Sequence, residues 1–292
     1  MVIFYRRLPS FNYLHPGTLR EALRMLSEYG GKARILAGGT DIFPKVKRRE
    51  AKVPGYLVDL KGIPNLNYIK HNRRGLKIGA LTTISDIETS LLVKSSYAVL
   101  HQAVSSMASI QIRNKGTLAG NICNAVPSAD CAPALLVLEA KLKLVKHGSA
   151  REVPVSSFFK GPNKTVMTRE EILTEIRIPL PPDNCRAIYI KLSPRHSMDL
   201  AVVGVAVLID YIEGKIKKAR IALGAVSPTP MRAKKAEKFL QGCELTLDII
   251  AEAAKIASAE TRPIDDHRAS AEYRREMVAV LLRRAISQLT SN

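Results

Sequence analysis

The sequence contains the stretch QIRNKGTLAGNICNAVPSADCAPAL at residues 111–135. Within it, Thr117 offers a hydroxyl, Gly120 leaves backbone uncovered, and the Asn121 side-chain amide can both donate and accept hydrogen bonds. Asp130, ten residues after Gly120, can accept hydrogen bonds from sugar hydroxyls. These residue types together indicate a loop that binds a polar, nucleotide-like ligand.

A second glycine loop lies earlier in the chain, at LAGGTD, residues 36–41. A short predicted strand, residues 33–37, runs directly into Gly38-Gly39, whose uncovered N–H groups can form a nest for a phosphate or pyrophosphate. An ordinary tight turn would explain the same two glycines. Neither loop has the G-x-G-x-x-G spacing of a Rossmann site, and the chain lacks a P-loop motif. If the two loops converge, they can hold a dinucleotide.

The composition is that of a globular protein. The chain has 292 residues, of which 46% are hydrophobic and 24% charged, which predicts two or three lobes. No apolar run is long enough for a signal sequence or a membrane span, so a cytoplasmic protein is expected. The 4 cysteines show no C-x-x-C and the 6 histidines no H-x-x-x-H, so no metal or iron–sulfur ligand set is expected in this chain.

Charge leaves several kinds of partner open. Lys and Arg outnumber Asp and Glu by 45 to 26, a net charge of +19 that suits an acidic partner protein, a nucleic acid or a polyanionic cofactor. A nucleic-acid-binding surface usually interleaves basic and aromatic residues, whereas aromatics are only 5% here and Trp is absent. Docking to acidic partner subunits is therefore preferred, and a basic nucleic-acid-binding protein is kept as an alternative.

Short strands mixed with helices, without a regular strand–helix beat, indicate an α+β fold. Helices are predicted to start at Thr18 and Thr83, and the acidic residues three positions later, Glu21 and Asp86, complete capping boxes. A proline-rich segment, residues 179–182, then marks a lobe boundary. Beyond it we predict strands at 188–192, 202–210 and 216–226, followed by two or three helices.

Read in chain order, LAGGTD (36–41), IGALTT (78–83), the stretch at 111–135 and KLSPRHSMDLAVVGVAV (191–207) resemble the FAD-binding medium subunits of molybdenum hydroxylases. The medium subunits of carbon monoxide, xanthine and nicotinate dehydrogenases belong to this family. The tail at 260–285 is similar to the family's C-terminal signature. The resemblance implies a vanillyl-alcohol-oxidase-type (PCMH-like) fold: FAD-binding subdomains at 1–57 and 58–179, then a C-terminal α+β domain at 180–292 with a three-stranded antiparallel sheet.

The resemblance also implies the cofactor site. The glycine loops would contact the FAD diphosphate and ribityl chain, chiefly through backbone N–H groups, with Thr82 and Asp130 beside them. Lys191 would sit near the flavin ring, while Arg195 and Asp199 are expected to form a structural ion pair. The implied FAD-binding residues are Leu36, Ala37, Gly38, Gly39, Thr40, Asp41, Thr82, Thr117, Ala119, Gly120, Asn121, Cys123, Asn124, Asp130 and Lys191. No catalytic side chain and no metal ligand are expected in this chain.

The implied function is electron transfer within a heterotrimer. A large subunit with the molybdenum cofactor would oxidise the substrate, and a small subunit would pass electrons through [2Fe-2S] clusters to FAD in this chain. FAD would then reduce an external acceptor. A dimer of such heterotrimers is implied. The alternative within flavin chemistry is a stand-alone FAD-dependent oxidase.

Overall fold

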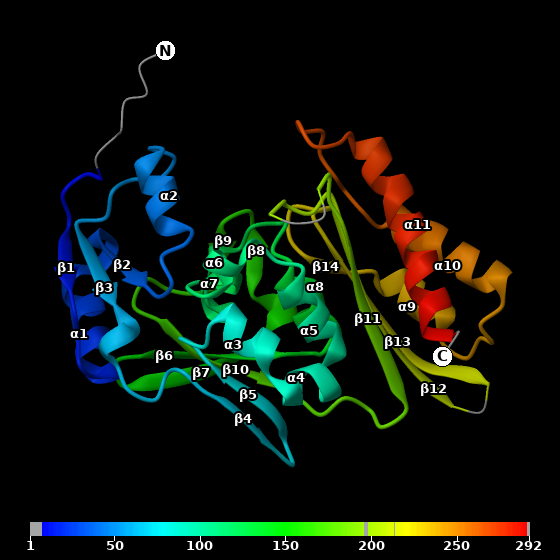
Figure 1. Ribbon diagram of the computed structural model, residues 1–292, viewed down its shortest axis with the longest axis horizontal. Coiled ribbons are helices and arrows are strands. Elements are labelled where there is room, and N and C mark those ends of the chain that lie inside the picture. Colours follow the sequence, from blue (N-terminus) through cyan, green and yellow to red (C-terminus); the bar gives the residue numbers. More distant parts are fainter. Residues whose placement is uncertain (1–7, 196–197, 213, 291–292) are drawn as a thin grey trace.

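A computed structural model describes residues 8–195, 198–212 and 214–290. Residues 196 and 197 of the motif at 191–207, and the first seven residues of the predicted first domain, lie outside this part. The described chain combines helices with three sheets of three, five and four strands and one two-stranded sheet. Figure 1 shows the three larger sheets following one another along the longest axis of the molecule. The α+β prediction is therefore confirmed.

The first sheet is parallel, in the order β1-β3-β2, with strands β1 (Asn12–Leu14), β2 (Ala33–Leu36) and β3 (Tyr56–Asp59). Helix α1 (Leu19–Tyr29) buries Leu23 and Leu26 against it, and α2 (Ile42–Lys47) follows β2. The Thr18 hydroxyl caps α1 by accepting from the Glu21 N–H. The predicted capping box is incomplete, because the Glu21 carboxylate accepts from the Gly17 N–H instead.

The five-stranded antiparallel sheet has the order β4-β5-β10-β6-β7. Its helices cover one face, as Figure 1 shows, and the capping box predicted at Thr83 and Asp86 is present. Strands and helices of this region, with the small β8–β9 sheet, are β4 (Ile69–Asn72), β5 (Gly75–Gly79), α3 (Ile84–Thr89), α4 (Leu91–Ser96), α5 (Ala98–Ser105), α6 (Ile110–Arg113), α7 (Leu118–Asn124), α8 (Cys131–Val137), β6 (Lys141–Lys146), β7 (Ser149–Pro154), β8 (Phe159–Gly161), β9 (Lys164–Thr165) and β10 (Ile172–Ile178).

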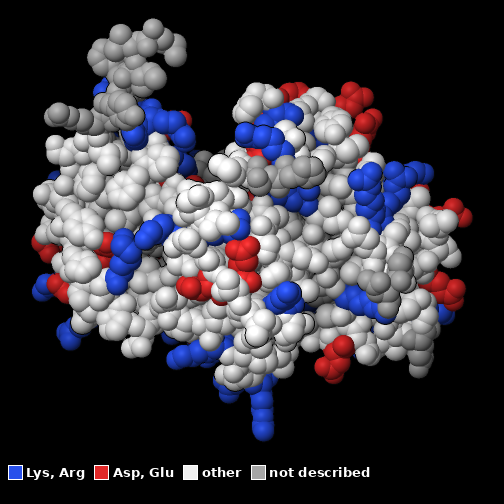
Figure 2. All heavy atoms as spheres, in the orientation of Figure 1, with Lys and Arg blue, Asp and Glu red and all other residues white. Residues whose placement is uncertain are grey.

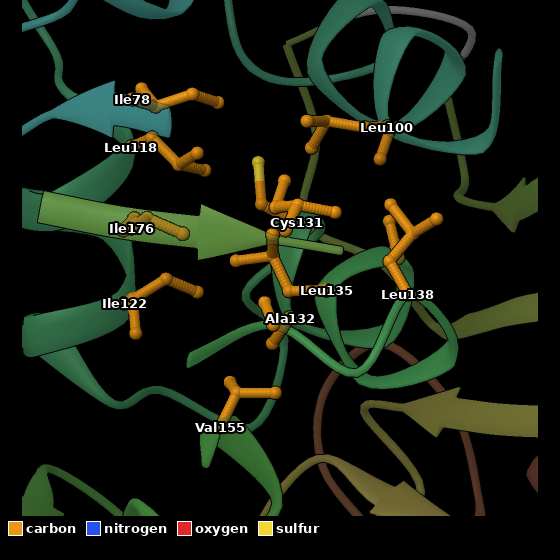
Figure 3. Packing of buried hydrophobic residues seen from close by; sticks show 14 of the residues in the cluster. Ile78, Leu100, Leu118, Ile122, Cys131, Ala132, Leu135, Leu138, Val155 and Ile176 are labelled. Atoms are coloured by element: carbon orange, nitrogen blue, oxygen red, sulfur yellow. The ribbon is translucent and has the colours of Figure 1, made fainter. Parts of the chain in front are cut away.

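The largest hydrophobic core lies between this sheet and its helices. Figure 3 shows part of it, where Ile176 of β10 meets Leu118 and Ile122 of α7. Each of these three side chains is fully buried, which contributes roughly 1.5–3 kcal/mol per side chain. The core thereby fixes α7, and with it the second glycine loop, on the sheet.

The C-terminal region contains the three predicted strands, β11 (Cys185–Leu192), β12 (Val203–Ile212) and β13 (Lys215–Gly224), as an antiparallel sheet. One correction is needed: a fourth strand of two residues, β14 (Met231–Arg232), pairs with β13. Two residues are too few to show a hydrophobic period, so sequence pattern could not reveal it.

Three helices, α9 (Lys234–Leu240), α10 (Leu247–Ala259) and α11 (Ala271–Thr290), follow this sheet. Its two faces pack differently: Val205 and Val207 belong to the core with these helices, whereas Ala206 and Leu208 belong to the core of the preceding region. The sheet is thus covered on both sides. Among the described helices, none is long and apolar enough to cross a membrane.

Candidate functional site

The two glycine loops meet. A Cβ added to Gly38 would lie 2.1 Å from the carbonyl oxygen of Lys115 and 2.9 Å from the Cα of Gly116, far inside normal contact. Only a residue without a side chain permits this approach of backbone to backbone. The loop after β2 and the loop before α7 are therefore one continuous surface, although 77 positions separate Gly38 from Lys115.

The first loop also depends on its second glycine. Gly39 has a φ of +75°, and a Cβ there would lie 2.7 Å from the Phe43 ring. This turn lets the chain leave β2 and enter α2 at once. Asp41 stands at the N-cap of α2, but its side chain makes no capping hydrogen bond, and Asp41 lines the cavity described below.

Hydrogen bonds of Thr82 and Thr117 stabilise the second loop. The Thr117 hydroxyl caps α7 by accepting from the Gly120 N–H at 3.0 Å. Thr82 is fully buried, and its hydroxyl donates to the Tyr68 carbonyl at 2.9 Å. Since the Thr82 carbonyl also accepts from the Leu118 N–H, Thr82 supports the loop instead of facing a ligand.

A cavity of about 390 Å³ opens over these loops, a volume within the usual range of small-molecule sites. Of the fifteen sequence-predicted residues, eleven line it: Ala37, Gly38, Gly39, Thr40, Asp41, Thr117, Ala119, Gly120, Asn121, Cys123 and Asn124. Asn121 is notable because its buried Oδ1 atom accepts no hydrogen bond from any described residue. Buried polar atoms are nearly always satisfied, so this oxygen is free to accept one from a ligand.

Cysteine chemistry is not indicated in the cavity. The Cys123 Sγ lies 3.6 Å from the Met167 Sδ, and both residues line the wall. Burial raises the pKa of the Cys123 thiol to about 12, so at neutral pH it is a thiol rather than a nucleophilic thiolate.

Sequence reasoning missed the cations of the cavity wall, which are Arg34, Lys45 and Lys52. The Lys45 ammonium donates to the Asn124 Oδ1 at 2.6 Å and to the Asn163 Oδ1 at 3.1 Å, so it is held at the cavity by the end of α7 and by the turn between β8 and β9. A lysine in a short helix usually belongs to a solvated face, and no local signal distinguishes Lys45 from the neighbouring Lys47.

Four predicted residues do not line the cavity. Leu36 is buried in β2, and Thr82 supports the second loop as described. Asp130 and Lys191 form a buried ion pair at 2.9 Å, and the Tyr189 hydroxyl also donates to Asp130 at 3.0 Å. Burial raises the pKa of the Asp130 carboxyl, while the Lys191 ammonium and its hydrogen bond act in the opposite direction.

This ion pair is linked to the cavity wall through Ser106. Besides binding Asp130, the Lys191 ammonium donates to the Ser106 carbonyl at 3.1 Å, and the next residue, Met107, lines the cavity. The expected ion pair between Arg195 and Asp199 is confirmed at 3.1 Å, with Arg195 mostly exposed.

Known protein families and relatives match this chain over nearly its whole length. Residues 9–181 match the FAD binding domain in molybdopterin dehydrogenase, and residues 188–289 match the CO dehydrogenase flavoprotein C-terminal domain. The glyceraldehyde dehydrogenase medium chain of Sulfolobus acidocaldarius is 36% identical over 281 residues, covering 96% of this chain and 99% of that one. The carbon monoxide dehydrogenase medium chain of Afipia carboxidovorans is 35% identical over 279 residues, 96% of each chain.

A solved structure is similarly close. Carbon monoxide dehydrogenase from Hydrogenophaga pseudoflava, in a form that lacks the Mo-pyranopterin moiety of the molybdenum cofactor, matches with a TM-score of 0.94 and 33% identity over 98% of this chain and 99% of that one. The chain therefore belongs to the family of FAD-binding medium subunits of molybdenum hydroxylases. It is the flavoprotein subunit of a multi-subunit oxidoreductase, as the sequence motifs predicted.

The cavity fits the cofactor of this family. FAD carries an anionic diphosphate, and the wall presents uncovered glycine backbone at Gly38 and Gly39 together with the Lys45 ammonium. The unsatisfied Asn121 Oδ1 can accept from a hydroxyl or ring N–H of the dinucleotide. Charge, backbone exposure and hydrogen-bonding capacity all agree with a bound dinucleotide.

Proposed function

We propose that this chain is the electron-transfer subunit of a heterotrimeric molybdenum hydroxylase. It would take electrons from [2Fe-2S] clusters of a small subunit and pass them to an external acceptor, while a large molybdenum-cofactor subunit oxidises the substrate. Two heterotrimers would associate as a dimer. The observation that supports this proposal most strongly is the contact between the two glycine loops, which brings eleven predicted cofactor residues to one cavity.

The chain's own residues would hold and orient FAD. In this proposal the loop at 37–41 binds the diphosphate through backbone N–H groups, and Lys45 adds a positive charge beside it. The Asn121 oxygen would accept one hydrogen bond from the cofactor. Bound flavin would supply the redox chemistry, because it accepts electrons singly and releases them singly or in pairs.

Lys191 would act without lining the cavity. Its ammonium is fixed by Asp130 and by the Ser106 carbonyl, next to the lining residue Met107. A positive charge near the flavin ring favours the more negative, reduced cofactor, and the Asp130 carboxylate bound to Lys191 offsets part of this effect. We therefore keep Lys191 and Asp130 in the proposed site as residues that tune it.

The test is the visible spectrum, metal content and subunit composition of the protein purified from its native source. We expect flavin and iron–sulfur absorbance, molybdenum, two further polypeptides and a mass near that of two heterotrimers. Flavin on a single chain that oxidises a substrate alone would show a stand-alone oxidase. Failure to bind added FAD would overturn both functions.

A further inference from the structure

One face of the five-stranded sheet carries a row of cations at directly paired positions. Lys70 of β4 is paired with Lys77 of β5, Lys77 with Arg177 of β10, and Arg177 with Lys141 of β6. Neighbouring strands lie roughly 4.8 Å apart, so this cationic row extends about 15 Å across four strands. It contains no acidic residue.

The cationic row points away from the core. Successive strand residues face opposite sides, and the neighbours Leu76, Ile78 and Ile176 are fully buried under the helices. Lys70 and Lys141 are exposed, whereas Lys77 and Arg177 are half-buried. Figure 2 shows Lys and Arg side chains along the lower border of the molecule, where the β4–β5 hairpin of Figure 1 projects.

Only part of this charge is balanced within the described chain. Arg177 forms ion pairs with Glu175 and Glu152, which lie in the adjacent row, and Lys77 adds a weaker attraction to Glu175. Lys70 lies over the Tyr68 ring at 4.9 Å. No described carboxylate forms an ion pair with Lys70, Lys77 or Lys141.

The row has no evident purpose within the isolated chain. Like charges directly opposite one another on a sheet reduce its stability. None of the four residues lines the FAD cavity, so cofactor binding does not explain them. An arrangement that costs stability and serves neither core nor cofactor indicates a binding surface.

We propose that the cationic row docks an acidic face of a partner subunit in the assembled enzyme. This rests on the proposed function only in assuming partner subunits. In the adjacent row, Lys143 is paired with both Glu175 and Glu152, so charges of both signs stand beside the cationic row. Separate acidic side chains can avoid these two glutamates, whereas a continuous phosphate backbone running past the row would meet them, which favours a protein partner. Charge pairing across such an interface sets orientation and association rate.

The experiment compares two triple variants of the FAD-loaded chain. K70Q/K77Q/K141Q removes the three unpaired lysines of the row, and K217Q/K235Q/K238Q removes three exposed lysines of the C-terminal region. Binding to the purified partner subunits is measured at low and at physiological salt. We expect the row variant to bind about tenfold more weakly at low salt, with a flatter salt dependence, and the control to change less than about twofold.

Two further measurements separate docking from a structural role. Zero-length carbodiimide crosslinking of the native complex is expected to join Lys70 or Lys141 to Asp or Glu of another subunit. Thermal unfolding of the free, FAD-loaded row variant is expected at the same temperature as wild type or higher, because like-charge repulsion has been removed.

Equal affinity of both triple variants for the partner subunits would overturn the proposal, as would a lowered unfolding temperature of the row variant with no intersubunit crosslink. Row-dependent binding to double-stranded DNA or to anionic phosphatidylserine vesicles, with subunit binding unaffected, would assign the row to a different partner and also overturn it. If no subunits copurify at all, the proposed function itself fails, which the spectrum and gel show independently.

Discussion

At the cavity wall, Gly38 lies against the Lys115–Gly116 backbone because Gly38 has no side chain. In the C-terminal region, segments far apart in the sequence are joined instead by buried charged side chains. Lys191 of β11 forms an ion pair with Asp130 at the start of α8, and Arg274 of α11 donates to the Val202 carbonyl just before β12. A close backbone contact of this kind requires a residue without a side chain, and the sequence shows where the glycines are. A buried charged side chain requires a partner of opposite charge or a carbonyl group, and only the three-dimensional structure shows which residue supplies it.

The largest effect is expected at Arg274, which is only 2% exposed. Its guanidinium donates to the Val202 carbonyl at 2.6 Å, to the Ala225 carbonyl at 3.1 Å and to Asp266 at 2.7 Å. Arg274→Met should therefore lower the free energy of unfolding by about 4 kcal/mol in urea titration. Arg275→Met, an exposed control one residue away, should change it by less than about 0.5 kcal/mol.

At the Asp130–Lys191 pair, Lys191→Met should cost about 3 kcal/mol, since it leaves a buried carboxyl with the Tyr189 hydroxyl alone. Adding Asp130→Asn should recover part of this loss, because the second variant no longer buries an unpaired acid. A double variant whose loss equals the sum of the two single losses would show that the residues do not interact.

The third prediction concerns pH. Burial opposes ionisation of Asp266, but hydrogen bonds from the Arg268 backbone and side chain and the Arg274 charge together lower the pKa of this carboxyl. Such a group stabilises the fold above its unfolded pKa of about 3.9, and the contribution is lost as pH falls toward the folded pKa. Asp266→Asn should cost about 2 kcal/mol at pH 7, and the difference from wild type should shrink below pH 4.

This contrast also explains what sequence could predict. The strand before Gly38, the cap at Thr83 and the three long C-terminal strands follow from local pattern, and the structure has each of them. The Lys45 contacts to Asn124 and Asn163 span 79 and 118 positions, so no local pattern could reveal them. Asp130 and Lys191 were predicted from the motif, but their pairing with each other was not.

Where the two glycine loops meet, we expect a substitution to cause a moderate loss of stability and a larger loss of FAD affinity. The added methyl of Gly38→Ala would lie 2.1 Å from the Lys115 oxygen, so the two loops must separate. We expect about 1.5 kcal/mol lower stability and at least roughly tenfold weaker FAD binding, measured by flavin fluorescence. Gly17→Ala is the control, since nothing lies within 4 Å of its added Cβ, and it should change neither quantity.

The smallest effect on stability is expected at Asn121, and it sharpens the contrast most. Its Oδ1 atom is buried without a partner, so Asn121→Ala should leave the unfolding of the FAD-free protein within about 0.5 kcal/mol of wild type, or stabilise it slightly.

The same substitution should weaken FAD binding about fivefold, because the cofactor loses one hydrogen bond. Thr82→Val gives the opposite pattern: its hydroxyl is fully satisfied by Tyr68, so stability should fall by about 1–2 kcal/mol while FAD affinity changes little in the protein that remains folded. If Asn121→Ala destabilised the FAD-free protein as much as Thr82→Val, the oxygen would have a partner within the fold, and Asn121 would be a structural residue instead of a cofactor ligand.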